Sequence, residues 1–196
     1  MPAPFIGSHT AIDFLNTAFA PNDEPVETIG DGRAYLQWLV GAELLSDTDA
    51  VQLQRRFGGN ALDAAAEEAR KVREWARSWL NRWRAAPQDD YAREIASLNK
   101  LLARQTHRLE LIQGKDGISL VERSHTESAD ALLALVTVQI AKLVAEEEPS
   151  LVKHCAGPAC TLWFLDRTKA HRRLFCSATD CGNRAKVAAF RQRQRH

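Results

Sequence analysis

The sequence lacks the features that mark membrane and exported proteins. None of its apolar runs reaches the roughly 18 residues that a transmembrane helix needs. The longest run, residues 132–138, is soon followed by Gln139 and Lys142, so we expect a buried helix there and no membrane partner. The first residues carry neither a basic region nor a long apolar stretch. We therefore expect no signal peptide and a cytoplasmic location, where thiols stay reduced.

Familiar catalytic motifs are also missing. The chain has no GxSxG sequence, no glycine-rich phosphate loop and no HExxH sequence. Its 6 histidines show no metal-binding spacing among themselves. We therefore expect that the protein is not an enzyme and that its function is binding.

Acidic residues are scarce at the C-terminal end. Residues 151–196 contain ten Lys or Arg but two acidic residues, which gives a net charge of +8. The whole chain carries +1, so the first 150 residues carry −7. A basic tail on an acidic body favours a polyanionic partner for the tail. The alternative is that the tail docks on its own acidic body.

Apolar periodicity predicts that residues 1–149 are mostly helical. A first short helix carries Ile12 and Phe14, with Ser8 as its expected cap. Ser46 resembles the cap of a further helix that the pair Gly58-Gly59 ends. The longest stripe of apolar residues with the 3.6-residue period follows, over residues 62–83.

One segment of this region has the pattern of strands. Residues 107–113 and 118–123 alternate apolar and polar residues and flank Gly114-Lys115-Asp116-Gly117. This arrangement predicts a β-hairpin near residues 107–123. We therefore expect a mainly α fold, with a helical N-terminal domain that contains one hairpin, residues 1–149. A small C-terminal zinc module that ends in a basic helix follows, residues 150–196.

The chain has four cysteines, and their spacing is C-x4-C-x15-C-x4-C. Two close pairs separated by about 15 residues are typical of a closed zinc site, in which no coordination position stays open for water. We therefore expect one structural Zn²⁺ ion. The alternatives are two disulfides, or a site in which His154 or His171 replaces one cysteine. The expected ligands are Cys155, Cys160, Cys176 and Cys181.

The residues around these cysteines predict a small strand and a basic helix. Residues 161–166 are expected to form a short strand, with Asp166 bonded to backbone. We expect Trp163 and Phe175 in the core of the small module, and the alternative is that they pack over the metal. The run after Gly182 contains good helix formers and few breakers. Arginine on such a helix can neutralise phosphates or bond a guanine edge. The alternative is a basic tail that is exposed to solvent and has no role in binding nucleic acid.

The C-terminal sequence resembles a known family. Residues 176–186, Cys-Ser-Ala-Thr-Asp-Cys-Gly-Asn-Arg-Ala-Lys, resemble the signature of the CGNR zinc finger family. The first cysteine pair followed by Phe-Leu-Asp at 164–166 matches the same pattern, so the resemblance covers about residues 151–193. Residues 12–17 (Ile-Asp-Phe-Leu-Asn-Thr), Trp-Leu at 38–39 and Leu-Asn at 98–99 resemble the ABATE domain that commonly precedes this finger.

The resemblance implies a stress-induced bacterial transcription regulator, whose finger binds DNA and whose body regulates. Family members carry an Arg-Arg-aromatic run directly before the third cysteine, whereas Arg172 and Arg173 are followed here by Leu174 and Phe175. The alternatives for Asn183 are contact with a base edge and capping of the terminal helix. The expected nucleic-acid-binding residues are Arg172, Arg173, Asn183, Arg184, Lys186, Arg191, Arg193 and Arg195.

A polar cluster in the body is a candidate ligand site. Asp13, Asn16 and Thr17 share one face of a largely apolar helix. Further candidates are Arg73, Arg77 and Asn99. The structural alternative is that these side chains satisfy backbone groups of the loop at 21–32. We therefore expect a zinc-containing DNA-binding transcription regulator whose body senses a signal or dimerises, with a small-molecule effector and a homodimer left open. The alternative is a protein-interaction or small-molecule-binding protein with a purely structural zinc knuckle.

Overall fold

The computed structural model describes residues 4–20, 24–104, 107–114, 117–124 and 128–194. The chain is mostly helical, with three small two-stranded antiparallel sheets in the described part. The prediction of a mainly α fold with one long hairpin and a C-terminal four-cysteine cluster before a last helix is confirmed. Its elements in order are α1 (Thr10–Leu15), β1 (Ala18–Phe19), β2 (Val26–Glu27), α2 (Gly32–Gly41), α3 (Asp47–Ala85), α4 (Ala92–Leu102), β3 (His107–Gly114), β4 (Gly117–Ser124), η2 (Ala129–Ala131), α5 (Leu132–Glu146), η3 (Pro149–Leu151), β5 (Val152–His154), β6 (Trp163–Leu165), η4 (Ala178–Gly182) and α6 (Asn183–Arg193).

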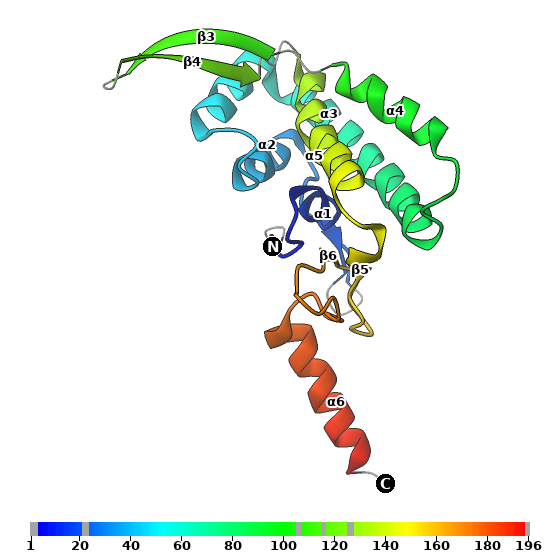
Figure 1. The fold of residues 1–196 in the computed structure, drawn as a ribbon. Coiled ribbons are helices and arrows are strands. Elements are labelled where there is room, and N and C mark those ends of the chain that lie inside the picture. Colours follow the sequence, from blue (N-terminus) through cyan, green and yellow to red (C-terminus); the bar gives the residue numbers. More distant parts are fainter. Residues whose placement is uncertain (1–3, 21–23, 105–106, 115–116, 125–127, 195–196) are drawn as a thin grey trace.

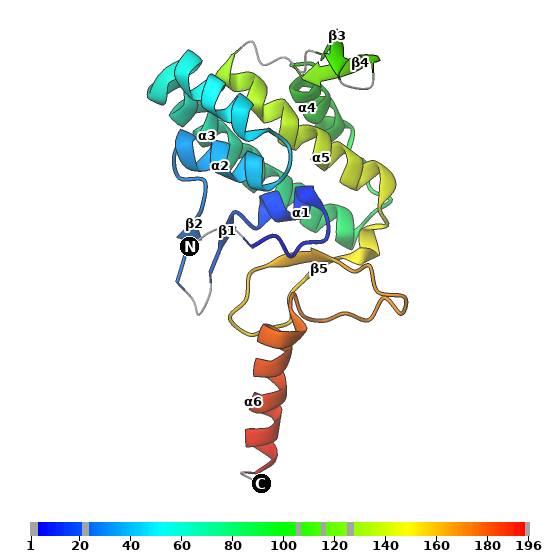
Figure 2. The ribbon, with the colours of Figure 1, turned by 90° about the vertical axis from the view of Figure 1, so that its left-hand side faces the viewer.

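Helix α3 is the longest helix of the body. Ser46 caps it by accepting a hydrogen bond of 3.0 Å from the backbone N–H of Asp49. Its backbone leaves helical geometry at Gly58, whose φ of 70° favours glycine. The predicted break at Gly58-Gly59 is therefore confirmed as a kink. Beyond the kink, the apolar stripe faces α1, α2 and α5 and forms the core with them (Figures 1 and 2).

Two contacts fix how the helices of the body meet. The hydroxyl of the fully buried Tyr35 on α2 donates a hydrogen bond of 3.2 Å to the carbonyl of Leu132, which begins α5. A Cβ added to Gly32 would lie 2.4 Å from the backbone of Leu62 on α3. Only a glycine therefore lets the start of α2 approach α3 so closely.

The first helix begins one residue later than the sequence suggests. Ser8 adopts a φ of 62°, and the cap of α1 is His9, whose Nδ1 accepts a hydrogen bond of 3.1 Å from the N–H of Ala11. The prediction of Ser8 as the cap is therefore wrong. An imidazole nitrogen satisfies the N–H group that a serine hydroxyl was expected to satisfy.

Strands β3 and β4 form the predicted hairpin. Leu111 pairs with Leu120, and Gly114 pairs with Gly117 next to the turn. The hairpin arches away from the helices in Figure 1. The side chains of Leu111 and Ile118 are 70% and 73% exposed, so they do not belong to the core.

Strands β5 and β6 join the cysteine-bearing segment to the body. Val152, Trp163 and Leu165 belong to the same buried cluster as the helices. Trp163 therefore packs in the core of the body, whereas Phe164 and the half-buried Phe175 pack against the cysteines. Trp163 thus lies neither over the metal nor in a separate core of the module, because alternate residues of a strand face opposite sides. The division into domains 1–149 and 150–196 stays a prediction.

Helix α6 has a different environment from the other long helices. None of its residues is buried, and it projects from the cysteine-bearing end of the molecule in both ribbon views (Figures 1 and 2). Within the part of the chain that the structure describes, no helix has the length and apolar character needed to cross a bilayer.

Candidate metal centre and nucleic-acid interface

The four cysteines form one cluster. Their sulfur atoms all lie within 4.8 Å of one another, with 3.8 Å between Cys160 and Cys176 and 3.6 Å between Cys176 and Cys181. Four sulfurs at the Zn–S bond length of about 2.3 Å in tetrahedral geometry are about 3.8 Å apart. The donor set and its spacing therefore fit a single structural Zn²⁺ ion, as the sequence predicts. All four thiols are free of disulfides.

A tight turn aims the first pair of sulfurs. The N–H of Cys160 bonds to the carbonyl of Gly157 at 3.0 Å. The N–H of Gly157 lies 3.4 Å from the sulfur of Cys155 and can donate to it. A Cβ at position 157 would lie 3.3 Å from the sulfur of Cys181. The glycine therefore leaves room for the four sulfurs to converge.

A turn at the start of the last helix aims the second pair. Ser177 accepts a hydrogen bond of 3.2 Å from the N–H of Asp180, so its side chain caps the turn η4 that carries Cys181. The N–H of Cys176 donates to the sulfur of Cys155 at 3.3 Å and links the two pairs. Such N–H groups stabilise negative charge on thiolate ligands.

The thiols of Cys160 and Cys176 influence each other's ionisation. Hydrogen bonding from Cys176 lowers the pKa of the Cys160 thiol to about 5, whereas that pairing and burial raise the pKa of Cys176 well above its usual range. Negative charge on Cys160 therefore disfavours ionisation of Cys176. A divalent cation that displaces the remaining protons would relieve this crowding, because thiolates are the form that binds zinc.

Arg184 adds a positive charge beside the cluster. Its guanidinium donates a hydrogen bond of 3.1 Å to the sulfur of Cys181. Four thiolates and one Zn²⁺ carry a net charge of −2, so an adjacent arginine offsets part of it. Arg184 therefore helps to hold the first turn of α6 on the metal centre.

The two histidines that were alternative ligands have other partners. The ring of His154 packs on Trp163 with 3.8 Å between centroids, and its Nε2 lies 2.9 Å from Oδ1 of Asn81. Nδ1 of His171 lies 3.3 Å from the carbonyl oxygen of Asp166. The candidate metal cluster among the described residues contains the four cysteines and neither histidine.

Asp166 holds the loop between β6 and the third cysteine. Its buried carboxylate accepts hydrogen bonds from Nζ of Lys153 at 2.7 Å, from the hydroxyl and N–H of Thr168, and from the N–H of Arg173 at 2.9 Å. Burial disfavours its charged form, but these bonds outweigh burial and hold the pKa of the carboxyl well below its usual range. The predicted bonding of Asp166 to backbone is confirmed.

The two arginines before the third cysteine differ. The guanidinium of Arg173 lies 4.3 Å from the ring of Phe164 and donates to the carbonyls of Phe175 and Cys176. It therefore braces the metal module. Arg172 is exposed.

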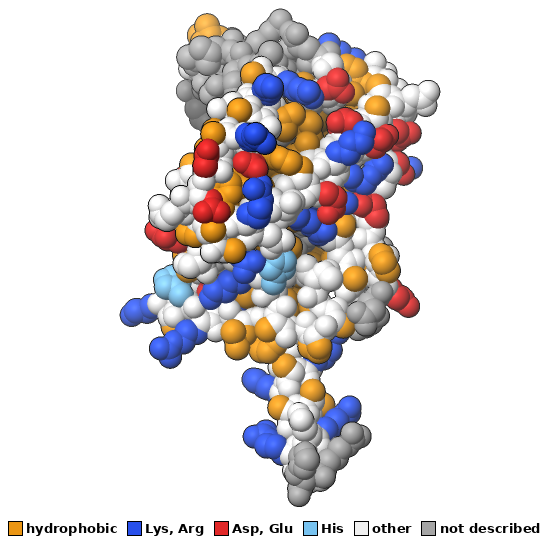
Figure 3. All heavy atoms as spheres, turned by 90° about the vertical axis from the view of Figure 1, so that its right-hand side faces the viewer, with side chains coloured by type: hydrophobic (Ala, Val, Ile, Leu, Met, Phe, Trp, Pro, Cys, Tyr) orange, Lys and Arg blue, Asp and Glu red, His pale blue; other side chains and the backbone are white. Residues whose placement is uncertain are grey.

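The basic residues of α6 lie at the surface. Lys186, Arg191 and Arg193 are exposed, and within the described residues they form no hydrogen bond or ion pair. Asn183 is exposed and does not cap the helix with its side chain. Arg195 lies outside the described residues. Figure 3 shows basic and apolar side chains on the projecting helix, and both acidic and basic ones over the body.

The polar cluster of the body is occupied by protein groups. The side-chain amide of Asn16 donates to the carbonyl of Trp163 at 2.9 Å, and its oxygen accepts from the N–H of Trp163 at 2.8 Å. Asp13 accepts a hydrogen bond of 2.7 Å from the N–H of Gly7. The carbonyl of Gly7 in turn accepts from the N–H of Leu165 at 2.8 Å. These side chains therefore hold β6 against the body.

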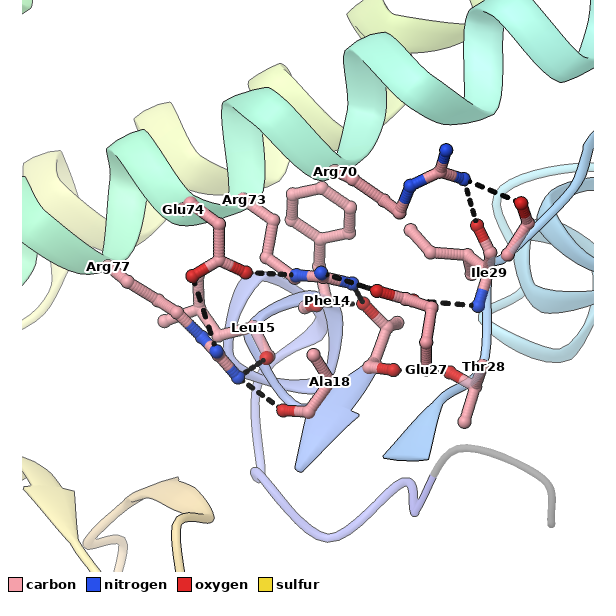
Figure 4. A network of polar contacts seen from close by, with 12 residues as sticks. Phe14, Leu15, Ala18, Glu27, Thr28, Ile29, Arg70, Arg73, Glu74 and Arg77 are labelled. Carbon is pink, nitrogen blue, oxygen red and sulfur yellow. Dashed lines mark hydrogen bonds and ion pairs between the residues drawn. The ribbon is translucent and has the colours of Figure 1, made fainter. Parts of the chain in front are cut away.

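Arg73 is the centre of a second network, drawn in Figure 4. Although 3% exposed, it forms two hydrogen bonds to the carboxylate of Glu27, at 2.9 and 2.6 Å, and others to Thr17 and Glu74. Partial burial would raise the pKa of Glu27, but the hydrogen bonds from Arg73 lower it. Arg77, one turn further along α3, donates to the carbonyls of Leu15 and Ala18.

These networks contain partners that the sequence did not identify. Arg70 donates to the carbonyls of Ile29 and Gly30 at 2.9 and 2.8 Å. Arg73 and Arg77 likewise bond to neighbouring segments of the chain. The three arginines recur at spacings of three and four residues beside the apolar stripe of α3. That spacing places them on one face, and it is the signal by which Arg70 could have been found beside the predicted Arg73 and Arg77.

Comparison with protein families agrees with the resemblance noted from the sequence. Residues 152–194 match the model of the CGNR zinc finger. Residues 8–147 match the model of the ABATE domain, described as "Putative stress-induced transcription regulator". A comparison with curated proteins gives no match. Because the second match covers most of the chain, the protein belongs to the ABATE family of transcription regulators, with a CGNR zinc finger at its C-terminal end.

Proposed function

We propose that the zinc module and α6 bind duplex DNA, and that the helical body sets the position of this unit. The observation that carries the proposal is the exposure of α6. It projects from the body, buries none of its residues and presents Lys186, Arg191 and Arg193 to solvent. Such a helix can neutralise phosphates at little structural cost to the protein.

The zinc module holds the start of this helix in place. The four cysteines anchor its first turn, and Arg184 donates to the sulfur of Cys181. Arg172 lies exposed on the neighbouring loop and adds to the basic surface. Arg173 supports the same surface from within, through its contacts with Phe164 and the carbonyls of residues 175 and 176.

The body is coupled to the module through β6 and the β1–β2 segment. Asn16 pairs with both backbone groups of Trp163, and the hydroxyl of Thr161 accepts a hydrogen bond of 2.9 Å from the N–H of Ala20. Arg77 holds the carbonyl of Ala18. A signal that alters the packing of α1 or α3 would therefore move the zinc module. This coupling supports a regulatory role for the body.

A homodimer in a cytoplasmic setting is part of the same proposal. The exposed Leu111 and Ile118 on the β3–β4 hairpin offer an apolar contact outside the core. Two-fold regulators bind paired half-sites, and a homodimer of this chain would supply two copies of α6. A purely structural zinc knuckle that serves protein interaction is the competing function.

Binding of the zinc-loaded full chain to duplex DNA at several salt concentrations tests the proposal. The variant is Arg191→Gln with Arg193→Gln, because Arg184 also contacts the metal centre. The matched control is Arg55→Gln with Arg93→Gln, which removes two exposed charges from the body.

We expect a steep loss of affinity with salt for the wild type and the control. The α6 variant should have a slope that is shallower by about 1.8, since each phosphate contact contributes about 0.9. Equal slopes for the variant and the control would contradict binding through α6. Absence of binding at low salt would favour the protein-interaction function.

A further inference from the structure

The exposed surface of α6 has an ordered arrangement of side chains. Asn183, Val187, Phe190 and Gln194 follow one another at spacings of four, three and four residues, so they lie on one line along the helix. All four are exposed, and Val187 and Phe190 are 40% and 56% exposed. This line, which we name the central line of α6, is therefore not part of the protein core.

A basic row lies on each side of the central line. Arg184 and Arg191 are seven residues apart and form one row, and Lys186 and Arg193 form the other. At 100° per residue, the rows are centred about 80° to one side and about 80° to the other. An uncharged line between two cationic rows complements a groove whose two rims are negatively charged.

The major groove of B-DNA has that shape and charge. It is about 12 Å wide, admits one α-helix and has a phosphate backbone along each rim. The eleven residues of α6 span about 16 Å, the length of roughly five base pairs. With the basic rows on the phosphates, the central line faces the edges of the bases.

Each residue type on the central line matches one base. Asn and Gln can form two hydrogen bonds with the edge of adenine, and apolar side chains contact the methyl group of thymine. We infer that α6 enters the major groove and reads A·T base pairs, with Val187 and Phe190 against thymine methyl groups. This inference rests on the proposed binding of DNA by α6 and adds the bases that it selects.

Other occupants fit the central line less well. A second copy of α6 would bring four like-charged rows together. A membrane surface needs a broad apolar face, whereas the central line has two large apolar side chains and two amides between its basic rows. The charge pattern therefore favours duplex DNA.

Selection from a random duplex pool followed by methyl removal tests the inference. The zinc-loaded full chain is used to enrich duplexes, and each thymine of the enriched sequence is then replaced by deoxyuridine, which lacks the methyl group. Wild type is compared with Val187→Ser, Phe190→Ser and with Arg191→Gln, Arg193→Gln. Zinc content, circular dichroism and sedimentation are measured for each protein.

We expect an A·T-rich sequence with at least one thymine whose methyl group contributes three- to tenfold in affinity. The serine variant should lose this dependence and keep the wild-type salt slope. The arginine variant should keep the dependence and lose part of the slope.

Three results would overturn the inference. Enriched DNA that binds equally well with deoxyuridine at every position would show that no methyl group is read. A serine variant whose affinity still depends on the thymine methyl group would show that Val187 and Phe190 do not read it. A dimer that the serine variant dissociates, with unchanged DNA selection, would assign the central line to self-association. Failure of every duplex to bind would instead overturn the proposed function, so the two failures are distinct.

Discussion

Helices α3 and α6 both carry several arginines, but they use them in opposite ways. On α3, Arg70, Arg73 and Arg77 bond to carbonyls and carboxylates of the segment between residues 15 and 30 (Figure 4). On α6, Arg191 and Arg193 are exposed and bond to no other described residue. A count of basic residues does not separate these cases.

What separates them is the surroundings of each helix. The apolar stripe of α3 brings it against α1, α2 and α5, so its arginines meet the backbone groups of nearby segments. Helix α6 has no such stripe and buries nothing, so its arginines keep their capacity for phosphates. The difference supports the proposal that DNA binds to the C-terminal module, and it gives the arginines of the body a structural role.

Removal of zinc should produce the largest effect and should affect one region. Zinc in comparable small modules contributes about 10 kcal/mol or more of apparent binding free energy. With a strong chelator, we expect amide hydrogen exchange to become fast over residues 155–160 and 174–182 and to stay slow in α3 and α5. Re-addition of zinc should restore protection. A body that loses its protection together with the module would show that the two regions are not stabilised separately.

Replacement of arginine should affect stability in the body and not in α6. We expect Arg73→Ala to lower the free energy of unfolding by about 3 kcal/mol, because it removes a buried cation and leaves Glu27 without its partner. Arg193→Ala is the matched control, with an expected change within about 0.5 kcal/mol. Urea denaturation measures both.

Glu27→Gln combined with Arg73→Met should recover part of the loss, since both charges then disappear together. Equal losses from Arg73→Ala and Arg193→Ala would remove the distinction between the two helices.

A carboxylate without an arginine partner should show the opposite pH dependence from Glu27. Burial raises the pKa of Asp13 from 3.8 to about 6, against the effect of its backbone hydrogen bonds. The folded state then binds a proton more tightly than the unfolded state between these values, so this contribution to stability is lost as pH rises from about 4 to about 6.

Asp13→Asn removes this titration. We expect the variant to gain about 2 kcal/mol relative to wild type between pH 4 and pH 6, as measured by urea denaturation at each pH. Parallel stability curves for the two proteins would contradict a raised pKa for Asp13.

The sequence predicts the parts of the structure that depend on local spacing. The cysteine pairs, the cap at Ser46, the kink at Gly58 and the hairpin all follow from residues that are neighbours in the chain. They are confirmed because each is stabilised by its own turn or periodicity.

The partners of buried polar groups depend on contacts between distant segments. Asn16 directly follows the last residue of α1, but its partner Trp163 is 147 residues away, and no local pattern identifies it. Arg172 and Arg173 are adjacent and alike in sequence, yet Arg173 alone turns inward, because the bond from its N–H to Asp166 and the ring of Phe164 hold it there. The partners and orientations of these side chains therefore depend on tertiary packing.

Amide hydrogen exchange of the zinc-loaded full chain, with and without duplex DNA, tests the central claim most directly. An isolated helix of eleven residues is marginally stable in water, so the amides of α6 should exchange rapidly in the free protein. Bound to DNA, they should exchange at least about tenfold more slowly, while those of α2 and α3 keep their rates. Protection that appears in α2 or α3 and not in α6 would contradict the assignment of DNA binding to the C-terminal helix.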